Sequence, residues 1–156
     1  MTDWAVDRIR AFASEALSPG RLPMGATGLR AVGWATVDTD RAVAQLASLL
    51  GIGEDAFNAA PGSAALGALC RIAATGPVAG GIVLAVIEPA TEGRLAAALA
   101  RWDEGPVAAW YATVAAPDDA GTGLPGPFGR ERIVGGDPLT GPHRLLVQSP
   151  AGTIAT

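Results

Sequence analysis

Apolar and polar positions follow one another along the chain in segments that predict both helices and strands. Residues 3–17 carry apolar side chains at helical spacing, which predicts an amphipathic helix. The Pro- and Gly-rich stretch 18–28 breaks this pattern and indicates a linker. We therefore divide the chain into an N-terminal helix with its linker, residues 1–28, and a single domain, residues 29–156. The helix must cover its apolar face with the domain or with a partner subunit; that face consists of Ala5, Ile9, Phe12, Ala13 and Ala16.

The first part of the domain shows the pattern of a strand, a helix and three further strands. Residues 29–37 are strand-like, and Asp38 is a candidate N-cap for an amphipathic helix that ends at Gly51. The expected buried stripe of this helix is Ala42, Leu46, Leu49 and Leu50. Three strand-like segments follow, the first of them weak, at residues 55–61, 65–74 and 81–88.

A second helix and a second set of strands complete the pattern. Thr91 is a candidate cap for a helix that ends near Gly105, and residues 107–114 are strand-like. The expected apolar face of that helix is Leu95, Ala98, Leu99 and Trp102. A Gly- and Pro-rich loop at 116–129 precedes three short strands, at residues 130–136, 143–150 and 152–156. The second half therefore repeats the β-α-β-β-β order of the first, with its helix reduced to a loop.

Composition and charge narrow the class of protein. The chain has 156 residues, of which 49% are apolar, and this predicts one packed domain. The net charge is −4 and the eleven basic residues, all Arg, are dispersed, so we expect no nucleic-acid partner. No apolar run approaches the ~20 residues that span a bilayer, and the N-terminus lacks a signal pattern. We therefore expect a cytoplasmic protein without a membrane partner. Cys70 is the only cysteine, which excludes an intrachain disulfide and favours an inert core thiol.

Three segments resemble motifs of the vicinal-oxygen-chelate superfamily, also called the glyoxalase/bleomycin-resistance/dioxygenase superfamily. Residues 33–51 resemble its opening strand, its Asp-x-Asp-Arg-Ala helix start and its Leu-Gly ending. Residues 82–105 resemble its strand that ends in Glu-Pro, followed by a linker helix and a Gly. Residues 148–156 resemble its final turn and last strand. The resemblance implies an α+β fold in which two βαβββ modules form a curled mixed sheet, the cup, and it implies a homodimer.

Members of that superfamily often hold a divalent metal in the cup with His, Glu, His and Glu on the first, fourth, fifth and eighth strands. By motif these four positions fall on Ala31, Glu88, Ala109 (or Ala108 after a one-residue adjustment) and Ala155. One carboxylate cannot supply the three or four ligands that such a site needs. The only histidine, His143, is expected in a solvated turn. We therefore expect a metal-free protein without a cofactor.

Glu88 is the candidate for acid–base chemistry. Alternation along its strand places it on one face with Leu84 and Val86, and we expect that face to line the cup. A carboxyl in an apolar cup is a candidate general acid or base. The structural alternatives are an ion pair with Arg71 on the neighbouring strand, or capping of the helix that follows Pro89.

Aromatic residues are candidates for lining the cup. Tyr111 shares strand parity with Ala109 and is expected to line it, and a register shift of one residue places Trp110 there instead. Either ring suits a flat or hydrophobic ligand. Trp34 is expected beneath the first module's helix, and Trp102 is expected to pack in the core.

Three functions are compatible with these residues. The first is a metal-free protein that binds a small, partly hydrophobic molecule in an apolar cup, with Glu88, Arg71, Tyr111 and Trp110 as candidate ligand-binding residues. The second is a metal-independent isomerase or lyase with Glu88 as catalytic acid or base. The third is a non-catalytic structural or regulatory homologue whose cup is filled by side chains. We favour the first, because alanines at the metal-ligand positions leave room in the cup.

Overall fold

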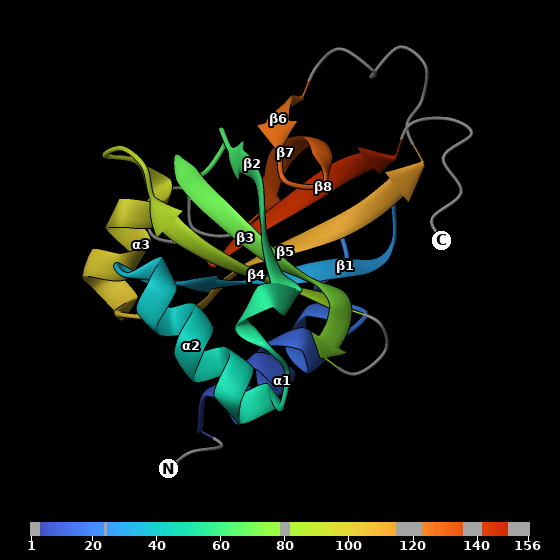
Figure 1. The fold of residues 1–156 in the computed structure, drawn as a ribbon. Helices are drawn as coiled ribbons and strands as arrows, with labels where there is room; N and C mark the ends of the chain where they lie inside the picture. Colours follow the sequence, from blue (N-terminus) through green and yellow to red (C-terminus); the bar gives the residue numbers. More distant parts are fainter. Residues whose placement is uncertain (1–3, 24, 79–81, 115–122, 136–141, 150–156) are drawn as a thin grey trace.

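The computed structural model describes residues 4–23, 25–78, 82–114, 123–135 and 142–149. In this part of the chain a curled eight-stranded sheet is accompanied by three α-helices (Figure 1). The helices are α1 (Trp4–Ala16), α2 (Thr39–Leu50) and α3 (Arg94–Trp102), and the 3-10 helix η1 (Glu54–Ala56) follows α2. The strands are β1 (Ala26–Ala35), β2 (Phe57–Ser63), β3 (Ala68–Val78), β4 (Ile82–Pro89), β5 (Gly105–Val114), β6 (Leu124–Gly126), β7 (Gly129–Gly135) and β8 (His143–Ser149).

The order of strands confirms the predicted α+β fold with two modules of the same topology. The order is β2-β3-β4-β1-β5-β8-β7-β6, so the last strand of each module lies beside its first. β1 pairs in parallel with β4, β5 pairs in parallel with β8, and the antiparallel pair of β1 and β5 joins the modules. The predicted last strand, 152–156, and the segment between β5 and β6, 115–122, lie outside the described residues. The last described strand is instead β8, and β6 forms within the predicted loop.

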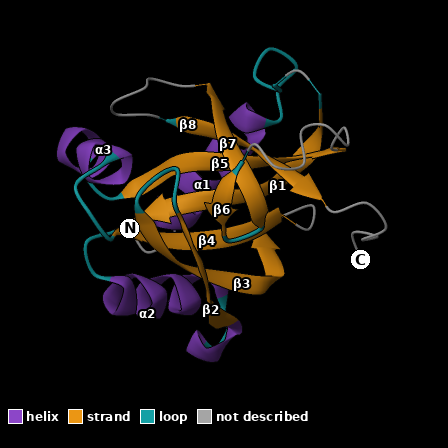
Figure 2. Cartoon of the chain, turned by 90° about the horizontal axis from the view of Figure 1, so that it is seen from above, coloured by secondary structure: helices purple, strands orange, loops and turns teal. Residues whose placement is uncertain are grey.

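The two outermost strands of the sheet approach each other, which makes the sheet nearly barrel-like (Figure 2). The backbone N–H of Ala64, next to β2, donates a hydrogen bond of 3.0 Å to the carbonyl of Pro125 in β6. The concave inner face of this curled sheet is the cup.

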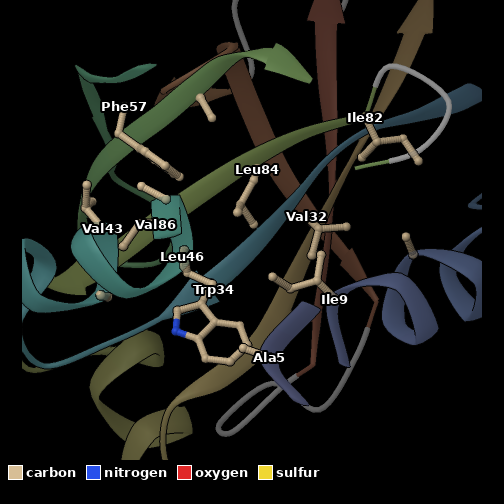
Figure 3. Close-up of a cluster of buried hydrophobic side chains, with 14 residues drawn as sticks. Ala5, Ile9, Val32, Trp34, Val43, Leu46, Phe57, Ile82, Leu84 and Val86 are labelled. Carbon is tan, nitrogen blue, oxygen red and sulfur yellow. The ribbon is translucent and has the colours of Figure 1, made fainter. Parts of the chain in front are cut away.

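Helices α1 and α2 cover the outer face of the sheet. Val32 and Trp34 of β1 and Leu84 and Val86 of β4 lie among their side chains (Figure 3). Trp34 is therefore beneath the helix of the first module, as predicted. The caps of α2 are also confirmed, because Asp38 accepts from the N–H of Arg41 and Gly51 adopts the left-handed conformation (φ 70°). Its buried stripe includes Ala42 and Leu46 as predicted, with Val43 and Ala47 in place of the half-buried Leu49 and Leu50.

Helix α3 packs against the inner face through Leu95 and Ala98. Two predictions for this helix were wrong. Gly93 rather than Thr91 occupies the N-cap position, without a side-chain cap. Trp102, the last residue of α3, is 50% exposed and is not a core residue.

The chain itself covers the apolar face of α1. Ala5, Ile9 and Ala13 belong to the core cluster of β1, β4 and α2, and Ala16 packs with residues of β5 and β8. Of the two alternatives for covering this helix, the structure shows packing on the domain. None of the described helices is long and apolar enough to cross a membrane.

Because Ile9 is 1% exposed, α1 contributes to the same core as the sheet. We expect Ile9→Ala to lower the free energy of unfolding by about 3 kcal/mol, through lost burial and the cavity left behind. Chemical denaturation followed by circular dichroism measures this change. Arg10→Ala, at an exposed position one residue further along, is the control and should change stability by less than about 0.5 kcal/mol. Equal stability of both variants would show that α1 does not belong to the folded core.

Candidate functional site

Trp110 occupies the centre of the cup. Its side chain comes from β5, is fully buried and lies directly over Gly33 of β1. A Cβ atom at Gly33 would lie only 2.7 Å from Cζ3 of Trp110, so a larger residue there would collide with the indole. Phe128 contacts the same ring edge-on, with 5.5 Å between the ring centroids. Small residues and one large ring therefore fill the inner face together.

A buried carboxylate holds this tryptophan in place. Glu131 of β7 is 1% exposed, and its Oε1 accepts a hydrogen bond of 2.9 Å from Nε1 of Trp110. Its Oε2 accepts from the hydroxyl of Ser63. Burial raises the pKa of Glu131, and the hydrogen bonds from Ser63 and Trp110 partly offset that effect. The centre of the cup is therefore a closed hydrogen-bonded cluster.

Glu88 is placed on the opposite face of the sheet. It shares a face with Leu84 and Val86, as alternation predicted, but that face packs against α2 (Figure 3). Its Oε1 accepts from the backbone N–H of Thr39 at 2.9 Å and from the Thr39 hydroxyl at 2.8 Å. The expectation that Glu88 faces the cup was therefore wrong. The carboxylate instead binds the start of α2, where the helix dipole favours negative charge, and not the helix after Pro89.

The other three candidate residues are divided between the two faces. Arg71 pairs with Asp40, with 2.9 Å between Nη2 and Oδ1, and not with Glu88. Tyr111 is buried on the outer face, where its hydroxyl donates to the carbonyl of Ala16, and burial raises its pKa. Only Trp110 lines the cup, which is the alternative that a one-residue register shift predicted.

Glu88 and Arg71 nevertheless both line a hollow of about 380 Å³ at the N-terminus of α2. We call it the α2 hollow; its lining is Asp38, Thr39, Asp40, Ala59, Ala60, Leu69, Cys70, Arg71 and Glu88. Its volume lies within the usual range for small-molecule sites. Leu69 leaves 56% of its surface uncovered, which is high for a large aliphatic side chain. Burial raises the pKa of Cys70 to about 12, so this thiol is a poor nucleophile.

The residues at the metal-ligand positions do not form a ligand set. Ala31 and Ala108 face the cup, whereas Ala109 faces α1 and Glu88 faces α2. Ala155 lies outside the described residues. The described part of the chain contains no group of three or more His, Cys, Asp or Glu side chains that could hold a metal.

His143 was predicted in a solvated turn, and this prediction was wrong. It is fully buried at the first position of β8, where it pairs with Ala108. Strand alternation places it on the same face as Leu145 and Val147, which line the cup.

The sequence reasoning did not identify Glu131 or its contact with Ser63. A signal for Glu131 was present, because it stands two residues before Ile133 and so shares its face of the strand. The signal was weak, since Glu131 lies between two arginines and the segment resembles a solvated edge. Nothing in the local sequence links it to Ser63, which is 68 residues away.

No protein-family model and no curated protein sequence matches the chain. Solved structures do resemble it. Methylmalonyl-CoA epimerase from Mycobacterium tuberculosis has a TM-score of 0.58 and 19% identity, over 81% of this chain and 91% of that one. A variant of the Streptomyces coelicolor enzyme in complex with 2-nitronate-propionyl-CoA has a TM-score of 0.61 and 19% identity, over 81% and 99%. A hypothetical protein from Bacillus halodurans has a TM-score of 0.57 and 10% identity, over 81% and 96%. At these identities the likeness establishes the fold alone, an α+β fold with a curled mixed sheet.

The cluster around Glu131 predicts a large loss of stability on truncation. Glu131→Ala should lower the free energy of unfolding by about 3 kcal/mol, because the Trp110 indole and the Ser63 hydroxyl lose a buried acceptor. The exposed Glu92→Ala is the matched control, with an expected change below about 0.5 kcal/mol. Urea denaturation monitored by tryptophan fluorescence measures both. A small effect of Glu131→Ala would contradict the closed cluster.

The same carboxyl should make stability depend on pH. Because burial raises its pKa in the folded state, the folded chain holds this proton more tightly than the unfolded chain. The resulting stabilisation is complete below the ordinary pKa of 4.5 and is lost as the pH rises through the raised value. The unfolding free energy of the wild type should therefore fall relative to that of Glu131→Gln as the pH rises through this window. Denaturation of both proteins at a series of pH values measures the difference, and parallel curves would refute the raised pKa.

Proposed function

We propose that the chain is a metal-free protein that binds a small, partly hydrophobic molecule, and that the ligand occupies the α2 hollow. The observation that carries this proposal is the uncovered apolar wall of a concave site. Leu69 is 56% exposed there, beside Ala59 and Ala60, so a ligand that covers Leu69 removes apolar surface from water. The centre of the cup is a less suitable place for a ligand, because Trp110 fills it.

The charges around the α2 hollow favour a cationic ligand. Three acidic residues, Asp38, Asp40 and Glu88, line the hollow together with a single basic residue, Arg71. The ion pair of Arg71 and Asp40 is exposed to water, with 39% and 84% of the two side chains accessible, and such pairs contribute little to stability. A ligand can therefore replace one partner at low cost. The net negative charge also disfavours polyanions such as the CoA esters bound in the similar structures.

The metal-free part of the proposal rests on the residues present. The inner positions of β1 and β5 carry Ala31 and Ala108, neither of which can bind a metal. Glu131, which faces the cup, has its two carboxylate oxygens bound by Trp110 and Ser63.

A thermal-shift screen tests the proposed ligand class. Phenyltrimethylammonium should stabilise the protein, by about 2.7 kcal/mol at a concentration 100-fold above Kd. Benzyl alcohol, acyl-CoA esters and divalent metal ions should give little or no shift. Leu69→Gln should weaken the binding of the cation about tenfold through lost apolar contact. Leu124→Gln changes a leucine that is similarly exposed but lies on β6, outside the hollow, and should leave affinity unchanged.

The screen has outcomes that contradict the proposal. Stabilisation by a metal that remains after extensive dialysis would refute the metal-free reading. Equal loss of affinity in Leu69→Gln and Leu124→Gln would place the ligand elsewhere. A complete absence of shifts would favour the structural or regulatory alternative, which the filled cup also supports.

A second candidate function is an isomerase or lyase that uses Glu88 as general acid or base. The observation that favours it is the asymmetry of this carboxylate. Among the described residues, Thr39 donates both hydrogen bonds that Glu88 accepts, and both end on Oε1. Oε2 therefore remains available at the hollow. A base needs such an accessible oxygen close to its substrate.

Glu88→Gln separates binding from catalysis. The amide oxygen can still accept from Thr39, so the start of α2 should be preserved. A binding protein should keep its affinity for the cation within a few-fold, measured by calorimetry. An enzyme should lose turnover of its substrate by about 100-fold or more. Thr39→Val is the control, since it removes one contact of Glu88 without removing the carboxylate; strong loss of turnover there as well would indicate a positioning effect.

A further inference from the structure

Arg30 is an extra residue in the pairing of β1 with β5. Leu29 lies opposite Tyr111 and Ala31 lies opposite Trp110, so Arg30 has no partner on β5. An extra residue of this kind is a β-bulge, which redirects a side chain from the face that alternation would give it. Leu29 packs on the outer face and Ala31 on the inner face.

The bulge places the guanidinium of Arg30 over the aromatic ring of Phe128. The distance from Cζ of Arg30 to the ring centroid is 5.4 Å, within the range of a cation–π contact. Phe128 in turn packs on Trp110, so the arginine lies at the edge of the filled cup. Its Nε is buried and has no hydrogen-bond partner among the described residues, and none of the ion pairs in that part of the chain includes it.

From this geometry we infer that Arg30 and Phe128 form a binding site for a carboxylate on an aromatic or similarly flat molecule. A buried N–H without an acceptor costs free energy, which a ligand oxygen would recover. Nε and the adjacent Nη of a guanidinium form a planar two-point fork that matches the two oxygens of a carboxylate. Phe128, already in contact with the guanidinium, offers an adjacent apolar surface for the ring of the ligand.

This site is separate from the α2 hollow. Arg30 is the fifth of the ten residues of β1, whereas the hollow lies beyond the C-terminal end of that strand. The two proposals therefore stand or fall independently, and a carboxylate probe and a cationic probe distinguish them.

Titration of the ¹⁵N-labelled protein with benzoate at constant ionic strength tests the site. The Nε–H resonance of Arg30, assigned by its loss in Arg30→Gln, should shift saturably, together with the amides of Ala31 and Phe128. Benzamide, which has the same shape without charge, should cause no saturable shift. Arg30→Gln should weaken benzoate binding at least tenfold as read from the amides, since a hydrogen bond to a charged group is lost. Arg132→Gln removes an exposed arginine from β7 and is the matched control, with unchanged binding expected.

Two further binding measurements determine which chemical group the site recognises. Arg30→Lys keeps the charge but removes the planar fork, so it should also weaken benzoate binding several-fold; full binding would overturn the two-point contact. Inorganic phosphate should bind more weakly than benzoate, and tighter binding of phosphate would overturn the choice of a carboxylate. Equal shifts in wild type and Arg30→Gln, or none that saturate, would overturn the site itself.

Discussion

The buried carboxylate of Glu131 is the contact on which the arrangement of the two modules depends. It accepts from Ser63, the last residue of β2 in the first module, and from Trp110 of β5 in the second. Its own strand, β7, is the second strand from the β6 edge of the sheet. One side chain therefore links β2, β5 and β7 across the inner face. The bond between Ala64 and Pro125 closes the sheet next to the same cluster. A carboxylate this deeply buried is tolerated only when its oxygens are bonded, so displacement of either module would expose an unsatisfied acceptor to the core.

The same cluster explains why small residues do not produce an open cup. Ala31, Gly33 and Ala35 alternate with outward-facing residues along β1. The inner side of this strand therefore carries no large side chain. Trp110 takes up that volume, and its contact distance to Gly33 leaves no room for a methyl group. Interiors are packed to nearly constant density, so missing volume at one position is filled from another. A row of alanines therefore marks where a large group fits, without telling whether that group is a ligand or a side chain.

The sequence predicted those features that local patterns determine. The caps at Asp38 and Gly51 and the apolar face of α1 follow from short-range geometry, and the two modules of a curled sheet were implied by the family resemblance. Alternation correctly grouped Glu88 with Leu84 and Val86, but it cannot decide which of the two faces of a strand is the inner one. That choice depends on where α1 and α2 pack, which is a tertiary property. The contact of Glu131 with Ser63 was equally inaccessible, because it joins residues that only closure of the sheet brings together.

Because Trp110 fills the centre of the cup, the groups available for ligands lie at two separate places along β1. Beyond the C-terminal end of β1, the acidic residues of the α2 hollow line the same site as the exposed Leu69. At the fifth residue of that strand, a bulge presents a guanidinium over an aromatic ring. Arg30 and Ala35 are five positions apart, which is roughly 17 Å along an extended strand, and the packed Trp110 cluster lies between. A single small molecule cannot reach both groups. The two proposed sites, which carry opposite charges, are therefore separate surfaces rather than the walls of one cup.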